Sequence, residues 1–457
     1  MASVGRRVGW AVLAAFIGLY GYWQGYRALS GMHANDFKHL YLGAIFLERG
    51  LDPYDEESFI RWAGTYGFRT INPYVYPPTT GLVLSFLTLW KPAVAAQVWF
   101  YLNHAMLIAA LVLCTWFFVG FRNPWLVAII VALAATSFPL RRTFTAGQLN
   151  CVLLLLYCGI YWASRRRREW LGGLLVGFGI LFKLVPGVFV IYFLLKRRWK
   201  ALGWTALWFI VMIGVSVWFA GWKTHLAYWP VMRAMGYGKS VWQETLIAGG
   251  QEPFYRDPYN QSPNSFFHHI AAGDPLGRTT PWIGLTEKFG GVALANGATV
   301  LVSLALILLT LRAVSKNEQD GMPPETPSSR PSRESLEVSL TIMLSLLLPS
   351  IMWDHYVVAL FFAQIVLFGQ LAATRRGLTW PMGLLVAASV LLAWPIPFDR
   401  PQFQQGIGLL AMSAKLFGVL ALFGLTLVEI RRRVSKEPPL ESFRAARKVC
   451  DSPEFLR

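Results

Sequence analysis

One acidic residue, Asp36, stands just past the first long apolar run, within the segment Asn35-Asp36-Phe37-Lys38-His39-Leu40-Tyr41. A carboxylate this close to a membrane surface is a candidate for chemistry rather than for anchoring. It can act as a general base that takes a proton from a hydroxyl group. The alternative is a helix cap, because Asp often precedes an apolar-periodic run as the N-cap residue. We expect Asp36 to be a general base at the outer face of a multi-span enzyme.

Cationic side chains that can neutralise a phosphate occur at two further places. Arg141 and Arg142 follow an apolar run, and Lys183 stands at the break Lys183-Leu184-Val185-Pro186 between two apolar segments. Ionisable residues within apolar regions are costly and usually functional. The alternatives are that the arginines only anchor the chain at the interface and that Lys183 snorkels toward water.

A third polar group, Trp353-Asp354-His355-Tyr356, lies between two apolar runs. His355 can donate a hydrogen bond to a phosphate, and the alternative is a structural pair of Asp354 with His355. Further candidates have simpler readings as interfacial side chains, ordinary turn residues or partners for freed backbone groups. The residues that we predict to contact the sugar or the acceptor are His39, Tyr76, Gln148, Asn150, Asn260, Gln261 and Asp354.

One reaction would use this set of side chains. A sugar donor built on a lipid phosphate carries its phosphate at headgroup level, and that leaving group needs charge neutralisation more than protonation. Lys183, Arg141 or Arg142, and His355 would bind the phosphate, while Asp36 would deprotonate the acceptor hydroxyl. One carboxylate base with in-line attack implies inversion at the anomeric carbon. No Gly-rich phosphate loop follows a predicted strand, and no acidic cluster demands an ion, so we expect no nucleotide-binding domain, no cofactor and no metal.

The composition indicates what kind of secondary structure positions these residues. The chain has 457 residues, of which 55% are hydrophobic and 14% are charged, whereas soluble domains carry about 25% charged residues. Long apolar runs recur from end to end, so we predict an all-α polytopic membrane protein. The net charge of +18 does not require nucleic acid, because Lys and Arg form short clusters between apolar runs, as the positive-inside rule expects.

The basic clusters also predict the topology. Clusters of basic residues at 165–168 and 196–200 flank an apolar segment, which is interrupted at Lys183. Two short helices that meet at this break would keep both clusters cytoplasmic. The apolar piece at about 79–90 is too short to span and is predicted to be re-entrant. When the membrane crossings are counted in this way, all of the candidate residues fall on the outer side of the inner (plasma) membrane, facing the periplasm or exterior.

We therefore predict one catalytic domain over residues 1–430, with about 11–13 transmembrane or re-entrant helices. Its other features are a first outer loop at 27–78 with an interfacial helix, a large outer loop at 221–281 and a cytoplasmic linker at 313–334. A basic cytoplasmic tail is predicted at 431–457.

Six short motifs occur in a particular order along the chain. They are Asp36…Gly50-x-x-Pro53-Tyr54, Tyr76-Pro77-Pro78, Gly147-Gln148-x-Asn150, Lys183-x-x-Pro186, Asn260-Gln261-Ser262 and Pro349-Ser350-x-x-Trp353-x-His355. In this order the chain resembles the membrane glycosyltransferases of family eighty-seven over about residues 8–430. The resemblance implies a GT-C fold and a polyprenyl-phosphate-mannose donor.

The resemblance further implies an inverting α-mannosyltransferase on the outer face, with a glycolipid or glycan as the acceptor. It makes Asp36 the base and places Trp353 and His355 near the donor phosphate. The sequence departs from the family at one point: the family often has two adjacent histidines, and here His355 is followed by Tyr356. The sugar can differ too, since related GT-C enzymes use arabinose or glucose carriers.

Two other functions stay open at this point. A transporter or flippase of lipid-linked sugars would predict repeated halves and polar groups at the bilayer midplane, but the sequence shows no internal repeat. An O-antigen ligase or polymerase would share a lipid-linked donor but would favour a pyrophosphate carrier.

Overall fold

The computed structural model describes residues 2–283, 290–314, 331–374 and 379–434. Within these ranges the chain is helical, and the extended pairing consists of an isolated antiparallel bridge between Asn260 and Trp353. The prediction of an all-α membrane protein is confirmed. Much of the expected linker at 313–334 and nearly all of the expected tail at 431–457 lie outside the described residues.

Several of the described helices are long and apolar enough to cross a membrane. Four meet this condition singly: α6 (Pro92–Phe118), α12 (Trp199–Ala220), α16 (Gly291–Ala313) and the helix formed by η5 (Asp354–Leu360) with α18 (Phe361–Thr374). A fifth arises if α7 (Pro124–Thr136) and α8 (Phe138–Ala146), bent by 53°, form one broken span.

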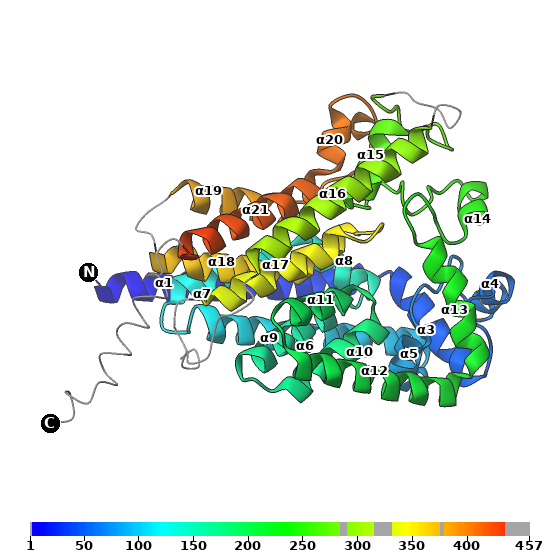
Figure 1. The fold of residues 1–457 in the computed structure, drawn as a ribbon, viewed down its shortest axis with the longest axis horizontal. Helices are drawn as coiled ribbons and strands as arrows, with labels where there is room; N and C mark the ends of the chain where they lie inside the picture. Colours follow the sequence, from blue (N-terminus) through cyan, green and yellow to red (C-terminus); the bar gives the residue numbers. More distant parts are fainter. Residues whose placement is uncertain (1, 284–289, 315–330, 375–378, 435–457) are drawn as a thin grey trace.

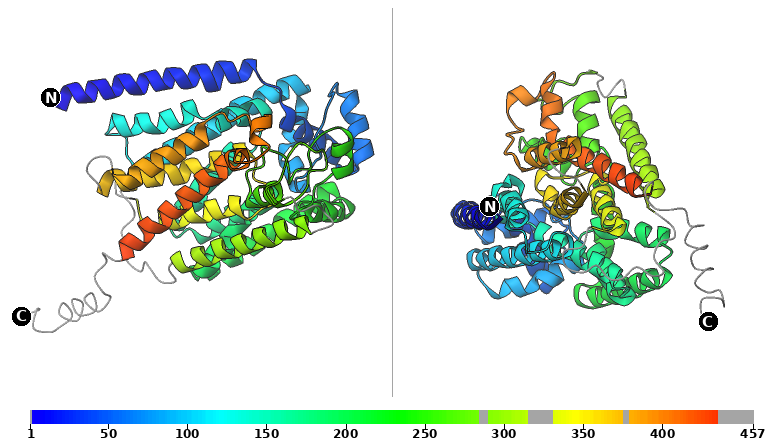
Figure 2. Two further views of the ribbon diagram at one scale, coloured as in Figure 1. Left: turned by 90° about the horizontal axis from the view of Figure 1, so that it is seen from above. Right: turned by 90° about the vertical axis from the view of Figure 1, so that its left-hand side faces the viewer.

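Further helices surround these spans. They are α1 (Ala2–Tyr20), η1 (Gly21–Tyr26), α2 (Arg27–Ser30), α4 (Glu56–Thr65), α9 (Asn150–Arg165), α17 (Arg333–Leu347), α19 (Trp380–Ala393), η6 (Pro401–Phe403), α20 (Gly408–Met412) and α21 (Ala414–Val434). Most long helices lie side by side along the long axis of the molecule (Figure 1; Figure 2). Helices α17 and α18 form the middle of this bundle and are buried almost throughout.

The segment after the first helix forms a compact helical unit at the far end of the bundle from the N-terminus (Figure 1). Its first helix, α3 (Asn35–Glu48), packs against α5 (Pro78–Leu84) and the 3-10 turn η2 (Ser85–Leu89). The interface is aromatic and aliphatic, and α3 is buried over most of its length. The helix predicted after Asp36 is therefore present, and it packs as a core element.

The break predicted at Lys183 is also present. Helix α10 (Glu169–Phe182) ends at this residue, whose backbone is extended. The 3-10 turn η3 (Val185–Gly187) and α11 (Val188–Leu195) follow. Pro186 cannot donate a backbone hydrogen bond, which favours an end of the helix here.

The expected large outer loop at 221–281 is partly helical. It contains α13 (Trp222–Ala234), α14 (Gln243–Ala248) and α15 (Pro263–Ala271). These helices lie at the same end of the molecule as α3 and α4 (Figure 1). Both outer segments therefore contribute to one end of the bundle.

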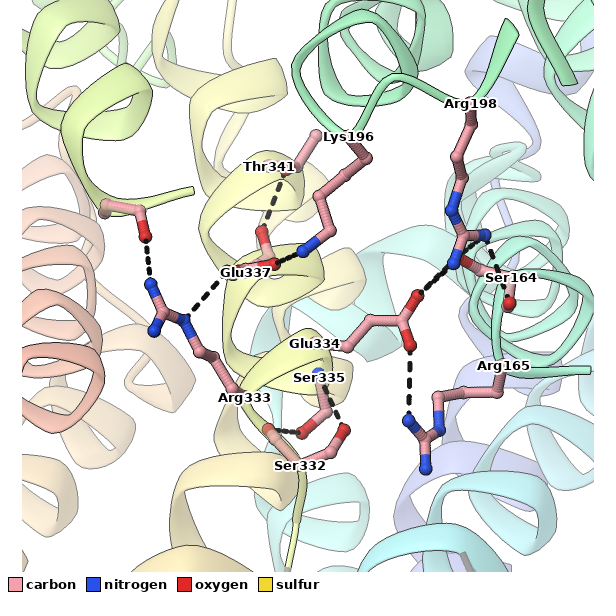
Figure 3. A network of polar contacts seen from close by, with 11 residues as sticks. Ser164, Arg165, Lys196, Arg198, Ser332, Arg333, Glu334, Ser335, Glu337 and Thr341 are labelled. Carbon is pink, nitrogen blue, oxygen red and sulfur yellow. Dashed lines mark hydrogen bonds and ion pairs between the residues drawn. The ribbon is translucent and has the colours of Figure 1, made fainter. Parts of the chain in front are cut away.

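The other end of the bundle holds a buried network of ion pairs (Figure 3). Glu334, in the first turn of α17, pairs with Arg198 at 3.0 Å and with Arg165 at 3.4 Å. Glu337, one turn later, pairs with Lys196 at 2.7 Å and with Arg333 at 3.1 Å. The basic clusters therefore bind buried carboxylates at a helix N-terminus, where the helix dipole also favours negative charge. We call this region the basic end.

Candidate active site

A cavity of about 680 Å³ opens at the end of the bundle opposite the network. Its walls come from the start of α3, the segment before α5, the end of α8, the segment after α14 and the start of η5. Six of the residues predicted from the sequence line it: Asp36, His39, Tyr76, Arg142, Gln148 and His355. We call this region the cavity end.

Asp36 lies in the first turn of α3 and is half-buried. The N-cap of this helix is Ala34, with φ of 51°, and no side chain caps it. Asp36 is therefore not the capping residue, and its carboxylate remains available to the cavity. Asn72 Nδ2 donates a long hydrogen bond to Asp36 Oδ1, at 3.3 Å.

Main-chain contacts fix the start of α3. The N–H groups of His33 and Ala34 donate to the carbonyl of Thr145, at 3.1 and 2.8 Å. Thr145 lies in the last turn of α8, the helix that also carries Arg142. The base candidate and a phosphate-binding candidate are therefore tied together through the backbone.

The turn after α8 brings Gln148 to the cavity. Gly147 has φ of +77°, and a Cβ atom there would lie 2.5 Å from Phe37 Cβ. Only glycine fits this left-handed conformation and close approach without strain. Trp99 Nε1 donates to the Gly147 carbonyl at 2.9 Å. The Oε1 atom of Gln148 is buried and has no hydrogen-bond partner among the described residues, so it is free to accept one from a ligand.

Arg142 lines the cavity and also forms an ion pair with a buried carboxylate. Its Nη1 lies 2.6 Å from Asp354 Oδ1, and its guanidinium lies over the ring of Tyr259, 4.5 Å from the centroid. Asp354 is fully buried, and its Oδ1 also lies 3.4 Å from His355 Nδ1. Asp354 does not line the cavity; it orients two residues that do.

Asn150 lies behind the part of the cavity wall that His355 forms. Its amide donates to the His355 carbonyl at 3.1 Å and to Thr143 Oγ1 at 3.0 Å. The side chain is buried and does not line the cavity. It therefore positions His355 from behind.

Asn260 and Gln261 are also buried outside the cavity wall. Asn260 donates to the Ser350 carbonyl at 3.0 Å and accepts from the Met352 N–H, also at 3.0 Å. Gln261 donates to the Met412 carbonyl at 2.8 Å. Together with the bridge between Asn260 and Trp353, these hydrogen bonds fix the backbone that precedes His355 and so help to position its side chain.

Lys183 belongs to a second, apolar cavity of about 300 Å³. Its ammonium lies 3.7 Å from the ring centroid of Tyr356, a favourable cation–π geometry. The side chain is 7% exposed, and Nζ has no hydrogen-bond partner among the described residues. The two cavities share one wall, formed by Val75, Tyr76, Phe254, Trp353 and Tyr356.

Arg141 is not brought to either of these cavities. Its guanidinium lies 5.1 Å from the ring centroids of Trp23 and of Phe138, beside a separate crevice. Adjacent residues of a helix project about 100° apart, so Arg142 and Arg141 face different surroundings.

His39 is buried, and its ring stacks on that of Tyr76 with a centroid distance of 5.7 Å. Burial lowers the pKa of His39 to about 4, so the imidazole is neutral near pH 7. Both ring nitrogens lack hydrogen-bond partners within the described chain. A neutral imidazole can both donate and accept, which suits contact with sugar hydroxyls.

Several cavity residues were not singled out from the sequence. They are His33, Asn72, Glu252, Asp257, Tyr259, Arg278 and Asp399. Asn72-Pro73 and Asp257-Pro258 are turn signals next to predicted motifs, and they offered a clue. Glu252 and Arg278 lie in irregular segments, where the turn signals Gly249-Gly250 and Asp274-Pro275 indicate loops but do not place these side chains in a cavity. Within the described ranges, no group of three or more His, Cys, Asp or Glu could hold a metal ion.

Comparisons with known proteins match most of the chain to glycosyltransferases. The family model described as glycosyltransferase family 87 matches residues 74–322. The chain is 29% identical over 354 residues to a polyprenol-phosphate-mannose-dependent alpha-(1-2)-phosphatidylinositol pentamannoside mannosyltransferase of Mycolicibacterium smegmatis, covering 75% of each chain. It is 26% identical over 412 residues to a protein of the same name from Mycobacterium tuberculosis, covering 88% of this chain and 79% of the relative.

A solved structure matches with low similarity. It is the crystal structure of ArnT from Cupriavidus metallidurans in the apo state, with 13% identity and a TM-score of 0.32, covering 94% of this chain and 77% of the other.

Proposed function

The chain belongs to glycosyltransferase family 87. On this basis we propose that it transfers a hexose from a polyprenyl-phosphate carrier to a hydroxyl acceptor, and that this hexose is mannose. The observation that carries the proposal is the pair of cavities with a shared wall. One is polar and contains Asp36, Arg142 and His355, and the other is apolar and holds Lys183 at its edge.

This pairing suits an amphiphilic donor. The sugar and phosphate would occupy the polar cavity, and the first isoprene units would enter the apolar one. The shared wall would then lie beside the phosphate, where Lys183 has an ammonium group without a hydrogen-bond partner in the described chain. Leaving a buried ammonium unpaired is costly, and an anionic ligand would remove that cost.

The reaction follows from these positions. Asp36 takes the proton of the acceptor hydroxyl as that oxygen attacks the anomeric carbon. The bond from the anomeric carbon to the phosphate oxygen breaks, and the polyprenyl phosphate leaves with the bonding electrons. Lys183, Arg142 and His355 stabilise the charge that develops on the phosphate. Attack on the face opposite the leaving group inverts the anomeric centre.

The relatives support the choice of sugar and acceptor. Both mycobacterial proteins are named for a polyprenol-phosphate-mannose donor and a phosphatidylinositol mannoside acceptor. We propose the same donor class here, with a glycolipid or glycan acceptor. We also propose that the protein lies in the plasma membrane with its cavity end on the outer face, because the positively charged network lies at the opposite end.

Membership of a glycosyltransferase family does not favour a transporter or flippase. The names of the relatives specify a monophosphate carrier, which also disfavours a ligase or polymerase that uses a pyrophosphate carrier.

The test is replacement of Asp36 by Asn in the purified full-length protein. Asp36→Asn is expected to lower transfer from polyprenyl-phosphate-mannose by at least about 10²-fold, since a positioned base contributes roughly 10²–10⁴-fold. The matched control is Asp55→Asn, which alters an exposed carboxylate in the same outer segment and should leave transfer unchanged. Full activity in Asp36→Asn would remove this residue as the base.

A further inference from the structure

Three acidic side chains of the cavity, Glu252, Asp257 and Asp399, have no role in the reaction above. Asp257 and Asp399 accept hydrogen bonds from Tyr259, whereas Glu252 stands apart. Glu252 follows the short helix α14, is 8% exposed and lines the polar cavity. Neither of its carboxylate oxygens has a hydrogen-bond partner in the described part of the chain. A buried carboxylate that lacks hydrogen-bond donors is costly, and a ligand that donates hydrogen bonds would lower this cost.

The acidic neighbour of Glu252, Asp274, is engaged elsewhere. Asp274 accepts hydrogen bonds from the backbone N–H groups of Leu276, Arg278 and Thr279, at 2.8, 2.8 and 2.6 Å. These donors stabilise the charged form of Asp274 and lower its pKa. Glu252 therefore faces a carboxylate that holds its own charge.

The nearby arginines do not form an ion pair with Glu252 in the described residues. Arg256 is buried and donates through Nη1 to the carbonyls of His268 and Ala272, at 3.3 and 3.1 Å. Arg278 donates through Nη2 to the Gly250 carbonyl at 2.7 Å. Burial and the charge of Asp274 raise the pKa of Glu252 to about 7. Near neutral pH this carboxyl is present in both protonation states, and its side chain lines the cavity.

The chemistry of Glu252 suits one part of the reaction better than the other. The ionised form of Glu252 repels a phosphate, so it would not stabilise the leaving group at Lys183 and Arg142. Two carboxyl oxygens on one carbon can instead accept hydrogen bonds from two hydroxyls of a sugar. Such a contact orients a neutral, hydroxyl-rich ligand.

We propose, on the basis of the proposed function, that Glu252 forms the acceptor subsite and binds neighbouring hydroxyls of the acceptor sugar. It is a binding residue that orients the acceptor toward Asp36. The ligand class is a glycoside with at least two adjacent free hydroxyls, presented from the outer face.

The test separates acceptor binding from donor binding. With polyprenyl-phosphate-mannose as donor and an alkyl α-mannoside as acceptor, KM is measured for each substrate in the wild type and in Glu252→Gln and Glu252→Ala. We expect the KM for the mannoside to rise about tenfold in Glu252→Ala, equivalent to about 1.4 kcal/mol, and less in Glu252→Gln. The KM for the donor should stay within about twofold.

A matched control and a set of deoxy acceptors sharpen this test. Glu244→Gln alters an exposed carboxylate of α14 and should change neither KM. Removing one acceptor hydroxyl should raise the KM in the wild type but add no further increase in Glu252→Ala, because both changes remove the same hydrogen bond.

Two outcomes would overturn the subsite. One is an unchanged KM for the mannoside in Glu252→Ala, and the other is a rise in the KM for the donor instead. If the wild type transferred nothing from polyprenyl-phosphate-mannose, the proposed function would fail, and direct binding of the mannoside, followed by tryptophan fluorescence, would still test Glu252. Equal binding by the wild type and by Glu252→Ala would then reject the subsite.

Discussion

The two ends of the bundle bury charge in opposite ways. At the basic end, Glu334 and Glu337 are each neutralised by two cations, and all of these groups form contacts within the protein (Figure 3). At the cavity end, Lys183 and Glu252 are equally buried, yet their charged atoms have no hydrogen-bond partners among the described residues. The first arrangement stabilises the fold, and the second leaves binding capacity for a ligand.

The difference identifies function better than burial or residue type does. Lys196 and Lys183 are both buried lysines at the end of an apolar helix. One is 2.7 Å from a carboxylate, and the other faces the ring of Tyr356. Identical substitutions at the two positions should therefore have different consequences.

The largest effect is expected for Lys183→Met. Loss of the ammonium should lower the rate of transfer by about 10²–10³-fold, because one electrostatic contact to the developing charge is removed. The thermal midpoint should change little. The substitution removes the cation–π contact with Tyr356, but it also removes a buried charge without a hydrogen-bond partner within the described chain. Activity assays with thermal unfolding in detergent check both parts. Strong destabilisation without loss of activity in the folded fraction would contradict this account of Lys183.

Lys196→Met, the same substitution at the basic end, should mainly affect stability. Removing the cation takes one ion pair from the buried Glu337, which keeps its pair with Arg333, at an expected cost of about 2–3 kcal/mol. The thermal midpoint should fall, while the KM and kcat of the folded fraction stay near the wild-type values. A kinetic defect as large as that of Lys183→Met would abolish the contrast between the two ends.

A smaller effect is expected for Gly147→Ala. The new methyl group would contact Phe37 and would force a left-handed conformation on a residue with a side chain, at a cost of about 1–2 kcal/mol. Because Phe37 is next to Asp36, the kcat should fall together with the thermal midpoint. Gly424→Ala, where an added Cβ has nothing within 4 Å, serves as the control. It should leave the kcat unchanged and should not lower the thermal midpoint, because Ala is more favourable than Gly inside a helix.

The smallest effect concerns the pH dependence of stability. The pKa of Glu252 is raised from 4.5 to about 7 in the folded protein by burial and by Asp274, so the folded state retains a proton that the unfolded state releases. Stability should therefore fall as pH rises from about 4.5 to 7 and level off above that range. Glu252→Gln should be as stable as the wild type at pH 4 and more stable at pH 8. An equal difference at both pH values would contradict this linkage.

The fold could be predicted well from the sequence because its signals are local. Apolar runs predict the helices, and Lys183 with Pro186 predicts the break between α10 and α11, since a charge and a proline both disfavour a continuous apolar helix. The helix after Asp36 follows from its apolar periodicity. These features need no knowledge of distant contacts.

The site could be predicted only in part, because spacing along the chain does not reveal hydrogen-bond partners. Asn260 and Gln261 are polar residues of an outer segment, yet their amides bind backbone groups from 350–352 and Met412. Arg141 and Arg142 are neighbours with the same side chain, and their projection about 100° apart on the helix places them in different surroundings. Glu252 stands between the turn signals Gly249-Gly250 and Pro253, but these signals do not place it in the cavity, because its position depends on how an irregular segment folds.

The attachment of α3 to α8 has an evolutionary consequence. The carboxylate of Asp36 is positioned through N–H groups of residues 33 and 34 and the carbonyl of Thr145, and such atoms are present whatever side chains the neighbours carry. Mutations can therefore accumulate on both helices while the distance between them is preserved. Position 147 is the exception, because the missing side chain is itself what allows the approach, and we expect it to tolerate the least drift among homologues.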